Sequence, residues 1–298
     1  MNRAAELRAL LARPGLRLMP CCFDALSARL VELAGFELGF MSGFGVSASR
    51  IGAPDTGLIS YAEMLDQGRN ICAAVGLPMI GDADTGYGNP LNVKRTLHGY
   101  LRAGFAGVMF EDQVAPKRCG HTEGKQVVAR DEALSRLRAA VDARDEARAV
   151  GGDIVIVART DARHTDGLDE AIARAQAFAE LGADVIFVEA LESRDEMQRV
   201  CAAIDRPLLV NCLEGGKTPI LPPAELEAIG FKIAAYPLTL LNTAIVAMRE
   251  ALGALARGES PAALLPFAEL RTLVGFDHYD REASRYVSPG AMPIGADG

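Results

Sequence analysis

Two aspartates at alternate positions form the first candidate site for chemistry. Asp82 and Asp84 lie at the end of an apolar run, just before a glycine-rich turn that ends at residue 88. Alternate residues of a strand point to the same side, so these carboxylates would repel each other without a cation. Oxygen ligands without histidine favour Mg2+ and also admit Mn2+, with Asp55 and Glu111 as candidate further ligands. The competing interpretation is an aspartate-rich turn that bonds its own backbone.

A cysteine in a basic, glycine-containing loop is the second candidate. Cys119 is flanked by Lys117, Arg118 and His121, and Gly120 follows it directly. Neighbouring cations lower the pKa of a thiol and prepare it to donate a proton or to act as a nucleophile. The loop could also close over a substrate. The alternative is a solvated basic loop that happens to contain a cysteine.

An arginine ends a buried apolar run and needs an anionic partner. Arg159 follows residues 154–158, which are all apolar, and an unpaired guanidinium there would be costly. We therefore expect Arg159 to pair with a carboxylate of the site or of a substrate. Glu189 and Asn211 offer further polar contacts at the ends of two later apolar runs.

The elements that must position these residues are eight apolar segments of strand length, separated by helical patterns. The segments are residues 16–22, 37–41, 78–83, 107–111, 153–158, 184–189, 207–211 and 232–236. Eight strand-helix units predict an α/β fold, and a closed (β/α)8 barrel is favoured over an open sheet.

Polar residues gather at the carboxyl ends of these strands. They are Ser42, Asp82, Asp84, Glu111, Asp112, Arg159, Asp161, Glu189 and Asn211. In a barrel these ends meet at one mouth, where active sites are built. The excess of carboxylates argues against ordinary loop beginnings, so we expect residues scattered along the chain to form one site.

The length of 298 residues fits one domain of this type. We expect the barrel to occupy about residues 16–258 and a C-terminal helical extension to occupy 259–298. Helical patterns cover residues 238–258 and 261–286, and the tail 287–298 is predicted to be mobile.

Composition excludes several classes of protein. The net charge is −8 and no basic run could track a phosphate backbone, so a nucleic-acid partner is not expected. The first 20 residues lack the apolar core of a secretion signal, and residues 233–248 are too short and too interrupted to span a membrane. Six cysteines without C-x-x-C pairs fit neither a disulfide framework nor a structural zinc site, and suggest the cytoplasm.

The motifs resemble those of the isocitrate lyase / phosphoenolpyruvate mutase superfamily over nearly the whole chain. The matching segments are Asp82-x-Asp84-Thr85-Gly86-Tyr87-Gly88, Glu111-Asp112-Gln113, Lys117-Arg118-Cys119-Gly120-His121, Ala158-Arg159-Thr160-Asp161 and Asn211-x-x-Glu214-Gly215-Gly216. The Lys-Arg-Cys-Gly-His segment is typical of the carbon-carbon lyases of this superfamily.

The resemblance implies a homotetramer in which paired subunits exchange the eighth barrel helix. It also implies Mg2+ held chiefly by Asp84, with Asp55, Asp82 and Glu111 acting through waters. Backbone donors to a substrate carboxylate would come from Ser42, Gly43 and Phe44. The rest of the pocket would come from Arg118, Gly120, His121, Arg159, Glu189 and Asn211.

The expected reaction is cleavage of a 2-hydroxy di- or tricarboxylate into a 2-oxo acid and a carboxylate. Metal chelation would acidify the substrate hydroxyl, Arg159, Arg118 and His121 would stabilise the departing enolate, and Cys119 would protonate it. The sequence does not single out the base that takes the hydroxyl proton.

Three departures from the methylisocitrate lyase pattern bear on the substrate. Phe40, Leu213 and Phe267 stand where those lyases carry tyrosine, threonine and arginine, although Arg271 lies close to Phe267. The segment 214–219 is similar to the branch that contains 2,3-dimethylmalate lyase. An alkyl-substituted malate is therefore expected; 2-methylisocitrate lyase, oxaloacetate hydrolase and phosphonate mutase are the alternatives.

Overall fold

The computed structural model describes residues 2–120 and 124–286 and divides the chain into two compact units, Met1–Asn242 and Thr243–Gly298. His121 and the tail 287–298, both singled out above, lie outside the described residues. The division between the units falls within a helix, before the boundary near residue 258 that the sequence suggests. The assignment of the chain to a single domain stays a prediction.

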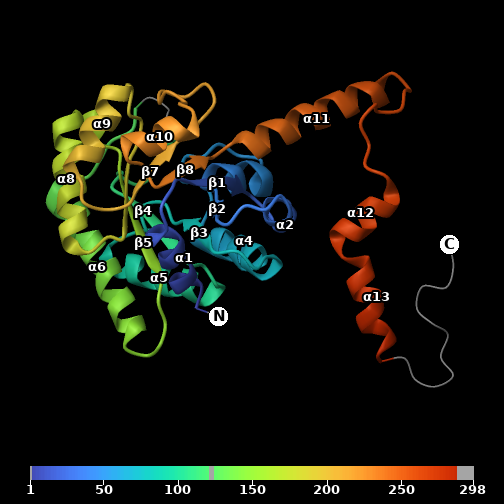
Figure 1. The fold of residues 1–298 in the computed structure, drawn as a ribbon, viewed down its shortest axis with the longest axis horizontal. Helices are drawn as coiled ribbons and strands as arrows, with labels where there is room; N and C mark the ends of the chain where they lie inside the picture. The colour runs from blue at the N-terminus through green and yellow to red at the C-terminus, as the bar shows by residue number, and fades with distance from the viewer. Residues whose placement is uncertain (1, 121–123, 287–298) are drawn as a thin grey trace. The chain divides into compact units, whose positions relative to one another are not determined.

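Eight parallel strands close into a barrel in their order along the chain, with β1 paired to β8 (Figure 1). The strands are β1 (Arg17–Cys22), β2 (Gly39–Met41), β3 (Met79–Asp82), β4 (Gly107–Glu111), β5 (Val155–Thr160), β6 (Val185–Val188), β7 (Leu208–Asn211) and β8 (Ile233–Tyr236). Each predicted strand coincides with an observed one within two residues at either end. The predicted (β/α)8 barrel is confirmed.

Helices surround the strands of the first unit; one precedes β1, and the others follow successive strands. They are α1 (Arg3–Ala12), α2 (Ala25–Leu33), α3 (Gly43–Val46), the π-helical turn η1 (Ser47–Ile51), α4 (Tyr61–Ala74), α5 (Pro90–Ala103), α6 (Arg130–Arg148), α7 (Ala162–Thr165), α8 (Leu168–Leu181), α9 (Arg194–Ala203) and α10 (Pro223–Ile229). Capping boxes start α2, α4 and α5, because side chains of Asp24, Ser60 and Asn89 accept the orphan backbone N–H groups there.

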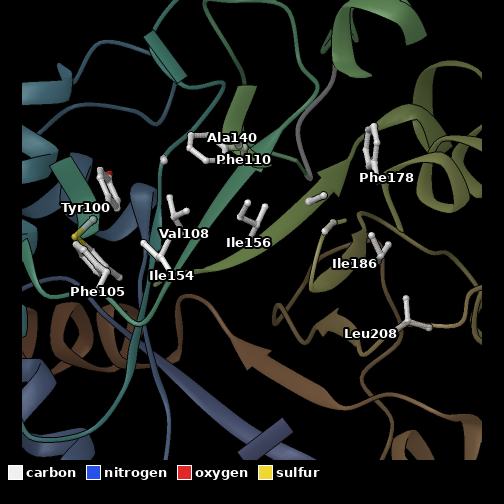
Figure 2. Close-up of a cluster of buried hydrophobic side chains, with 14 of the residues drawn as sticks. Tyr100, Phe105, Val108, Phe110, Ala140, Ile154, Ile156, Phe178, Ile186 and Leu208 are labelled. Atoms are coloured by element: carbon white, nitrogen blue, oxygen red, sulfur yellow. The ribbon is translucent and has the colours of Figure 1, made fainter. Parts of the chain in front are cut away.

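Two apolar layers hold the barrel together, because successive side chains of a strand point to opposite faces. Val155 and Val157 of β5 point into the barrel, where Leu7 of α1 closes the amino-terminal end. Ile154 and Ile156 belong to the outer cluster, which also contains Phe105 and Phe178 (Figure 2). Each such side chain contributes roughly 1.5–3 kcal/mol when fully buried. The inner layer stops short of the carboxyl ends, which leaves that mouth for polar groups.

The remaining helices are α11 (Thr239–Ala256), which runs from the first unit into the second, and α12 (Phe267–Val274) and α13 (Phe276–Ser284). Residues 261–286, which read as one helical stretch, form two helices. Gly275 adopts a φ of 94°, a left-handed conformation that ends α12. None of the described helices combines the length and apolar character needed to cross a membrane.

Candidate active site

A cavity lies at the carboxyl ends of the strands, as the sequence predicts. Every strand contributes at least one residue to its wall. These residues include Cys21, Phe40, Asp82, Met109, Arg159, Phe187, Leu209 and Ala235, in the order of the strands. Apolar and charged side chains share the wall, so the cavity suits a small ligand with anionic groups on a short carbon skeleton.

Most of the predicted site residues meet in this cavity. Those that line it are Ser42, Phe44, Asp55, Asp82, Cys119, Gly120, Arg159, Glu189 and Asn211. Asp84 and Glu111 lie just behind, each paired with a cation of the wall. Arg118 is exposed and is not among the lining residues. His121 lies outside the described residues.

Lys117 occupies a place that the sequence did not predict. Its ammonium lies 2.6 Å from Asp55 Oδ1 and 2.9 Å from Asp84 Oδ1, and its side chain is only 5% exposed. The lysine was expected among the cations beside Cys119. The structure instead places its charge between two carboxylates, because these would otherwise be buried without a counter-ion.

The carboxylate cluster fits a divalent cation. Asp55 Oδ1, Asp84 Oδ1 and Glu111 Oε1 are buried and accept no well-aligned hydrogen bond from the described residues. Among those residues, seven carboxylates and four cationic side chains are buried around the mouth; they are Asp55, Asp82, Asp84, Glu111, Asp112, Asp161 and Glu189, with Lys117, Lys125, Arg159 and Arg174. The excess of negative charge and the oxygen donors match the preference of Mg2+.

These carboxylates are not in a ligating arrangement. Within residues 2–120 and 124–286, no three histidine, cysteine, aspartate or glutamate side chains converge as a metal site. Both carboxylate oxygens of Asp82 accept backbone N–H groups, from Gly43 at 3.2 Å and from Asp84 at 3.1 Å. Asp82 therefore fixes the β2 and β3 loops, and Lys117 holds Asp55 and Asp84.

Burial dominates the acid-base properties of the cluster. It raises the pKa of Asp82 to about 6, and the nearby Asp84 adds to the effect. Burial likewise raises the pKa of Asp55 and, well above its usual range, that of Glu111. Burial opposes the charge of Lys117, but Asp84 and Asp55 outweigh it and raise the pKa of the lysine. The ammonium therefore stays charged among the carboxylates.

Arg159 is a cation of the cavity wall. Its guanidinium donates to Asp161 through Nε at 2.8 Å and Nη2 at 3.0 Å. Nη2 also lies 3.1 Å from Glu189 Oε2, and Nε lies 3.3 Å from Glu111 Oε2. The predicted pairing of Arg159 with carboxylates of the site is thus present. Three carboxylates orient the guanidinium while it still lines the cavity.

The backbone at Gly120 lies so close to Arg159 that a side chain there would force its neighbours to move. A Cβ built on Gly120 would lie 2.3 Å from Arg159 Nη2 and 2.6 Å from Glu189 Oε2. Any larger residue at this position would require Arg159 or Glu189 to shift. The neighbouring Cys119 carries a reduced, partly exposed thiol that lines the cavity.

Two buried polar residues were missed as site residues. Gln113 ends the Glu111-Asp112-Gln113 segment, and its side chain bonds the backbone of Arg118. The side chain of Lys125 is completely buried and contacts Asp161 at 2.9 Å. The only signal in the sequence was that Gln113 and Lys125 flank the loop that contains Cys119. Spacing alone does not predict a side-chain contact across that loop.

The chain is similar to several named enzymes. A family model described as phosphoenolpyruvate phosphomutase matches residues 7–256. The chain is 42% identical to 2,3-dimethylmalate lyase of Eubacterium barkeri over 93% of this chain and 96% of that enzyme. It is 45% identical to probable 2-methylisocitrate lyase 2 of Corynebacterium glutamicum, over 86% of this chain and 81% of the relative.

The chain is also similar in structure to solved enzymes. Oxaloacetate acetylhydrolase in complex with 3,3-difluorooxalacetate superposes with a TM-score of 0.90 at 37% identity, covering 96% of this chain and 98% of that one. Phosphonopyruvate hydrolase, solved with oxalate and Mg2+, has a TM-score of 0.86 at 30% identity, covering 97% and 100%. The chain therefore belongs to the phosphoenolpyruvate phosphomutase family, within the isocitrate lyase / phosphoenolpyruvate mutase superfamily, and is one of its carbon-carbon lyases.

Proposed function

We propose that this enzyme is a Mg2+-dependent lyase that cleaves an alkyl-substituted malate, of the 2,3-dimethylmalate type, into a 2-oxo acid and a monocarboxylate. The observation that carries the proposal is the composition of the cavity wall. Arg159 and the carboxylate cluster provide for a chelating 2-hydroxy acid, whereas Phe40 and Leu213 are apolar. They offer no cation to a third carboxylate, and an unpaired buried carboxylate would cost several kcal/mol of affinity.

The bound cation would be held by Asp84, with Asp55, Asp82 and Glu111 around it. When bound, it would acidify the hydroxyl of a chelated 2-hydroxy acid. Once a basic group of the site has taken the hydroxyl proton, the C2–C3 bond can break, so that C2 becomes a carbonyl and the electron pair passes to C3 as the enolate of a carboxylate. Arg159 stabilises that negative charge, and Cys119 donates the proton to C3.

The remaining predicted residues donate N–H or O–H groups to the substrate carboxylates, except Glu189, a carboxylate that acts by orienting Arg159. Glu189 and Asn211 flank Arg159 in the cavity wall. Ser42 and Phe44, which follow β2, line the same cavity. Gly43 already donates its N–H to Asp82. We therefore assign Gly43 to the support of the β2 loop and leave the predicted carboxylate contacts to its two neighbours.

We further propose that the enzyme works in the cytoplasm as a homotetramer in which paired subunits exchange the eighth barrel helix, α11. An apolar groove between β1, α2 and β8 supports the exchange. Leu18, Pro20, Leu30, Val31 and Phe36 line it. A helix from a second copy of the chain would cover this apolar surface.

A substrate comparison tests the proposed function. Purified enzyme with Mg2+ is assayed for kcat/KM on 2,3-dimethylmalate, 2-methylisocitrate, isocitrate and oxaloacetate, with the 2-oxo acid or oxalate product measured. We expect the highest value for 2,3-dimethylmalate. A higher value for 2-methylisocitrate would show that another cation, such as Arg271, reaches the cavity, and would overturn the proposed substrate.

A further inference from the structure

Cys119 lies between two residues whose backbone groups are fixed by buried side chains. On one side, Gln113 Nε2 donates to the Arg118 carbonyl at 2.9 Å, and the Arg118 N–H donates to Gln113 Oε1 at 2.9 Å. On the other side, the Lys125 ammonium donates to the Gly120 carbonyl. Neither Gln113 nor Lys125 contacts the thiol through any of these bonds.

Both of these residues are themselves anchored to the rest of the fold, Gln113 through its backbone and Lys125 through its side chain. Gln113 lies two residues after the end of β4. Its backbone carbonyl accepts a hydrogen bond from Arg136 Nη1 at 3.1 Å. A backbone bridge joins Gln113 to Val127 at the base of the loop. Lys125 Nζ lies 2.9 Å from Asp161 Oδ1, just beyond β5. The loop residues on either side of Cys119 are therefore tied to rigid parts of the fold.

Lys125 is also linked to Arg159, through the carboxylate of Asp161. The Asp161 oxygen that it contacts is the same one that accepts a bond from Arg159 Nη2 at 3.0 Å. The other Asp161 oxygen accepts from Arg159 Nε, and the Asp161 N–H donates to Asp112 Oδ1 at 2.9 Å. One ammonium thus links the peptide that follows Cys119 to the carboxylate that orients Arg159.

The burial of Lys125 needs an explanation beyond stability. Its side chain is 0% exposed, and an apolar residue of similar volume would avoid the desolvation cost of an ammonium. What an apolar residue could not do is bond the Gly120 carbonyl and Asp161 together. The two bonds therefore explain why a charge lies there.

We propose that Gln113 and Lys125 are positioning residues that hold Cys119 at the cavity, and that Lys125 in addition couples Cys119 to Arg159. Neither is a catalytic residue, because neither touches the reacting atoms. The inference rests on the proposed function for the role of Cys119 as proton donor. Its structural content, that the two side chains fix the thiol, stands apart from the identity of the substrate.

The kinetic test separates the two residues. In Gln113→Leu we expect kcat to fall by about 10- to 100-fold with KM nearly unchanged, since only the proton donor is displaced. In Lys125→Met we expect a similar fall in kcat and also a rise in KM. Asp161 would no longer be held by Lys125, so Arg159, which binds the substrate carboxylate, would be less well oriented by Asp161. Lys94→Met is the control, since Lys94 pairs with Glu146 on the outer helices. Equal kcat for both site variants and wild type would overturn the proposal.

A labelling test needs no substrate. The rate of iodoacetamide modification is measured at Cys119 by peptide mass spectrometry, with the partly exposed Cys201 as the internal reference. In both variants the backbone beside Cys119 loses a hydrogen bond that holds it. The rate of modification of Cys119 should therefore rise several-fold, while the rate at Cys201 should stay the same. Unchanged labelling of Cys119, or equal acceleration at both cysteines, would show that the two side chains do not specifically hold the thiol. If the wild type cleaves none of the four acids, the proposed function fails while this test still decides the positioning role.

Discussion

At the scale of single residues, the site is a balance of buried charges. Lys117 and Arg159 each lie among carboxylates, and burial raises the pKa of Asp55 and Glu111 within that set. Such a cluster is costly to bury, and removing one member leaves its partner unpaired. The residues at the mouth should therefore respond to substitution more strongly than charged residues on the surface.

Asp84→Asn tests the metal site with little change of shape. Asp84 has a φ of 49°, a left-handed conformation that asparagine tolerates well, so the backbone should be retained. Loss of the ligand charge should weaken Mn2+ binding by about 100-fold or more, measured by isothermal titration calorimetry. Asp66→Asn, which removes a surface partner of Arg50, is the control. Metal affinity equal to that of the wild type would contradict the assignment of Asp84.

Gly120→Ala tests the close approach of the loop to Arg159. The added Cβ would displace Arg159 or Glu189, so kcat/KM should fall by about 100-fold while the melting temperature changes little. Gly76→Ala is the control, because Gly76 is exposed, has no left-handed backbone, and its Cβ would meet only Glu32 Oε1, at 3.0 Å. A Gly120→Ala enzyme as active as the control would mean that the loop lies farther from Arg159 during turnover.

At the scale of elements, stability and chemistry occupy opposite ends of the strands. At the amino-terminal end, Arg8 of α1 pairs with Asp153 at 3.1 Å and with Asp184 at 2.6 Å. Arg148 of α6 pairs with Asp153 at 2.8 Å, so the same carboxylate joins two helices to the start of β5. These ion pairs lie at the other end of the strands from the catalytic mouth.

Asp153→Asn should therefore lower stability in a pH-dependent manner without changing kcat. Partial burial opposes ionisation of Asp153, but bonds from Arg8 and Arg148 outweigh it and lower its pKa. A lowered folded-state pKa contributes stability above the unfolded value of about 4, and this contribution disappears as the pH falls through the folded value. The wild type should exceed the variant by about 1 kcal/mol at pH 7, measured by urea unfolding, after allowance for solvent screening.

The difference in unfolding free energy should narrow as the pH falls below about 4. A gap that stays constant between about pH 7 and about pH 3 would show that the carboxylate charge does not contribute. Glu63→Gln, which changes an exposed capping residue of α4, indicates how much of the effect is general to surface carboxylates.

At the scale of the whole molecule, apolar surface points to association. The helix α11 exposes Val246, Met248, Leu252 and Leu255, each by more than half. The groove beside β1 and β8 in the first unit is lined by apolar side chains. Apolar surfaces of this extent mark interaction sites in proteins.

We expect light scattering after size exclusion to give the mass of four chains. Leu252→Glu combined with Leu255→Glu should dissociate the assembly, because the new charges would be buried against a partner. Leu91→Glu, at an equally exposed leucine on α5, should leave the mass unchanged. A wild-type protein with the mass of one chain would refute the proposed tetramer.

The sequence by itself determined the barrel, its eight strands and the end at which the site is built. Apolar runs with a polar residue at the carboxyl end specify both a buried parallel strand and the location of its functional group. This is why Asp82, Arg159, Glu189 and Asn211 could be placed at one mouth from local pattern alone. Only the tertiary structure decided the partners of these residues. Lys117 forms ion pairs with Asp55 and Asp84, and Lys125 forms one with Asp161, across distances in sequence that no local pattern records. The physical reason is that a buried charge pairs with an opposite charge that is close in space. Which charged side chains are close depends on how the elements pack in the closed barrel.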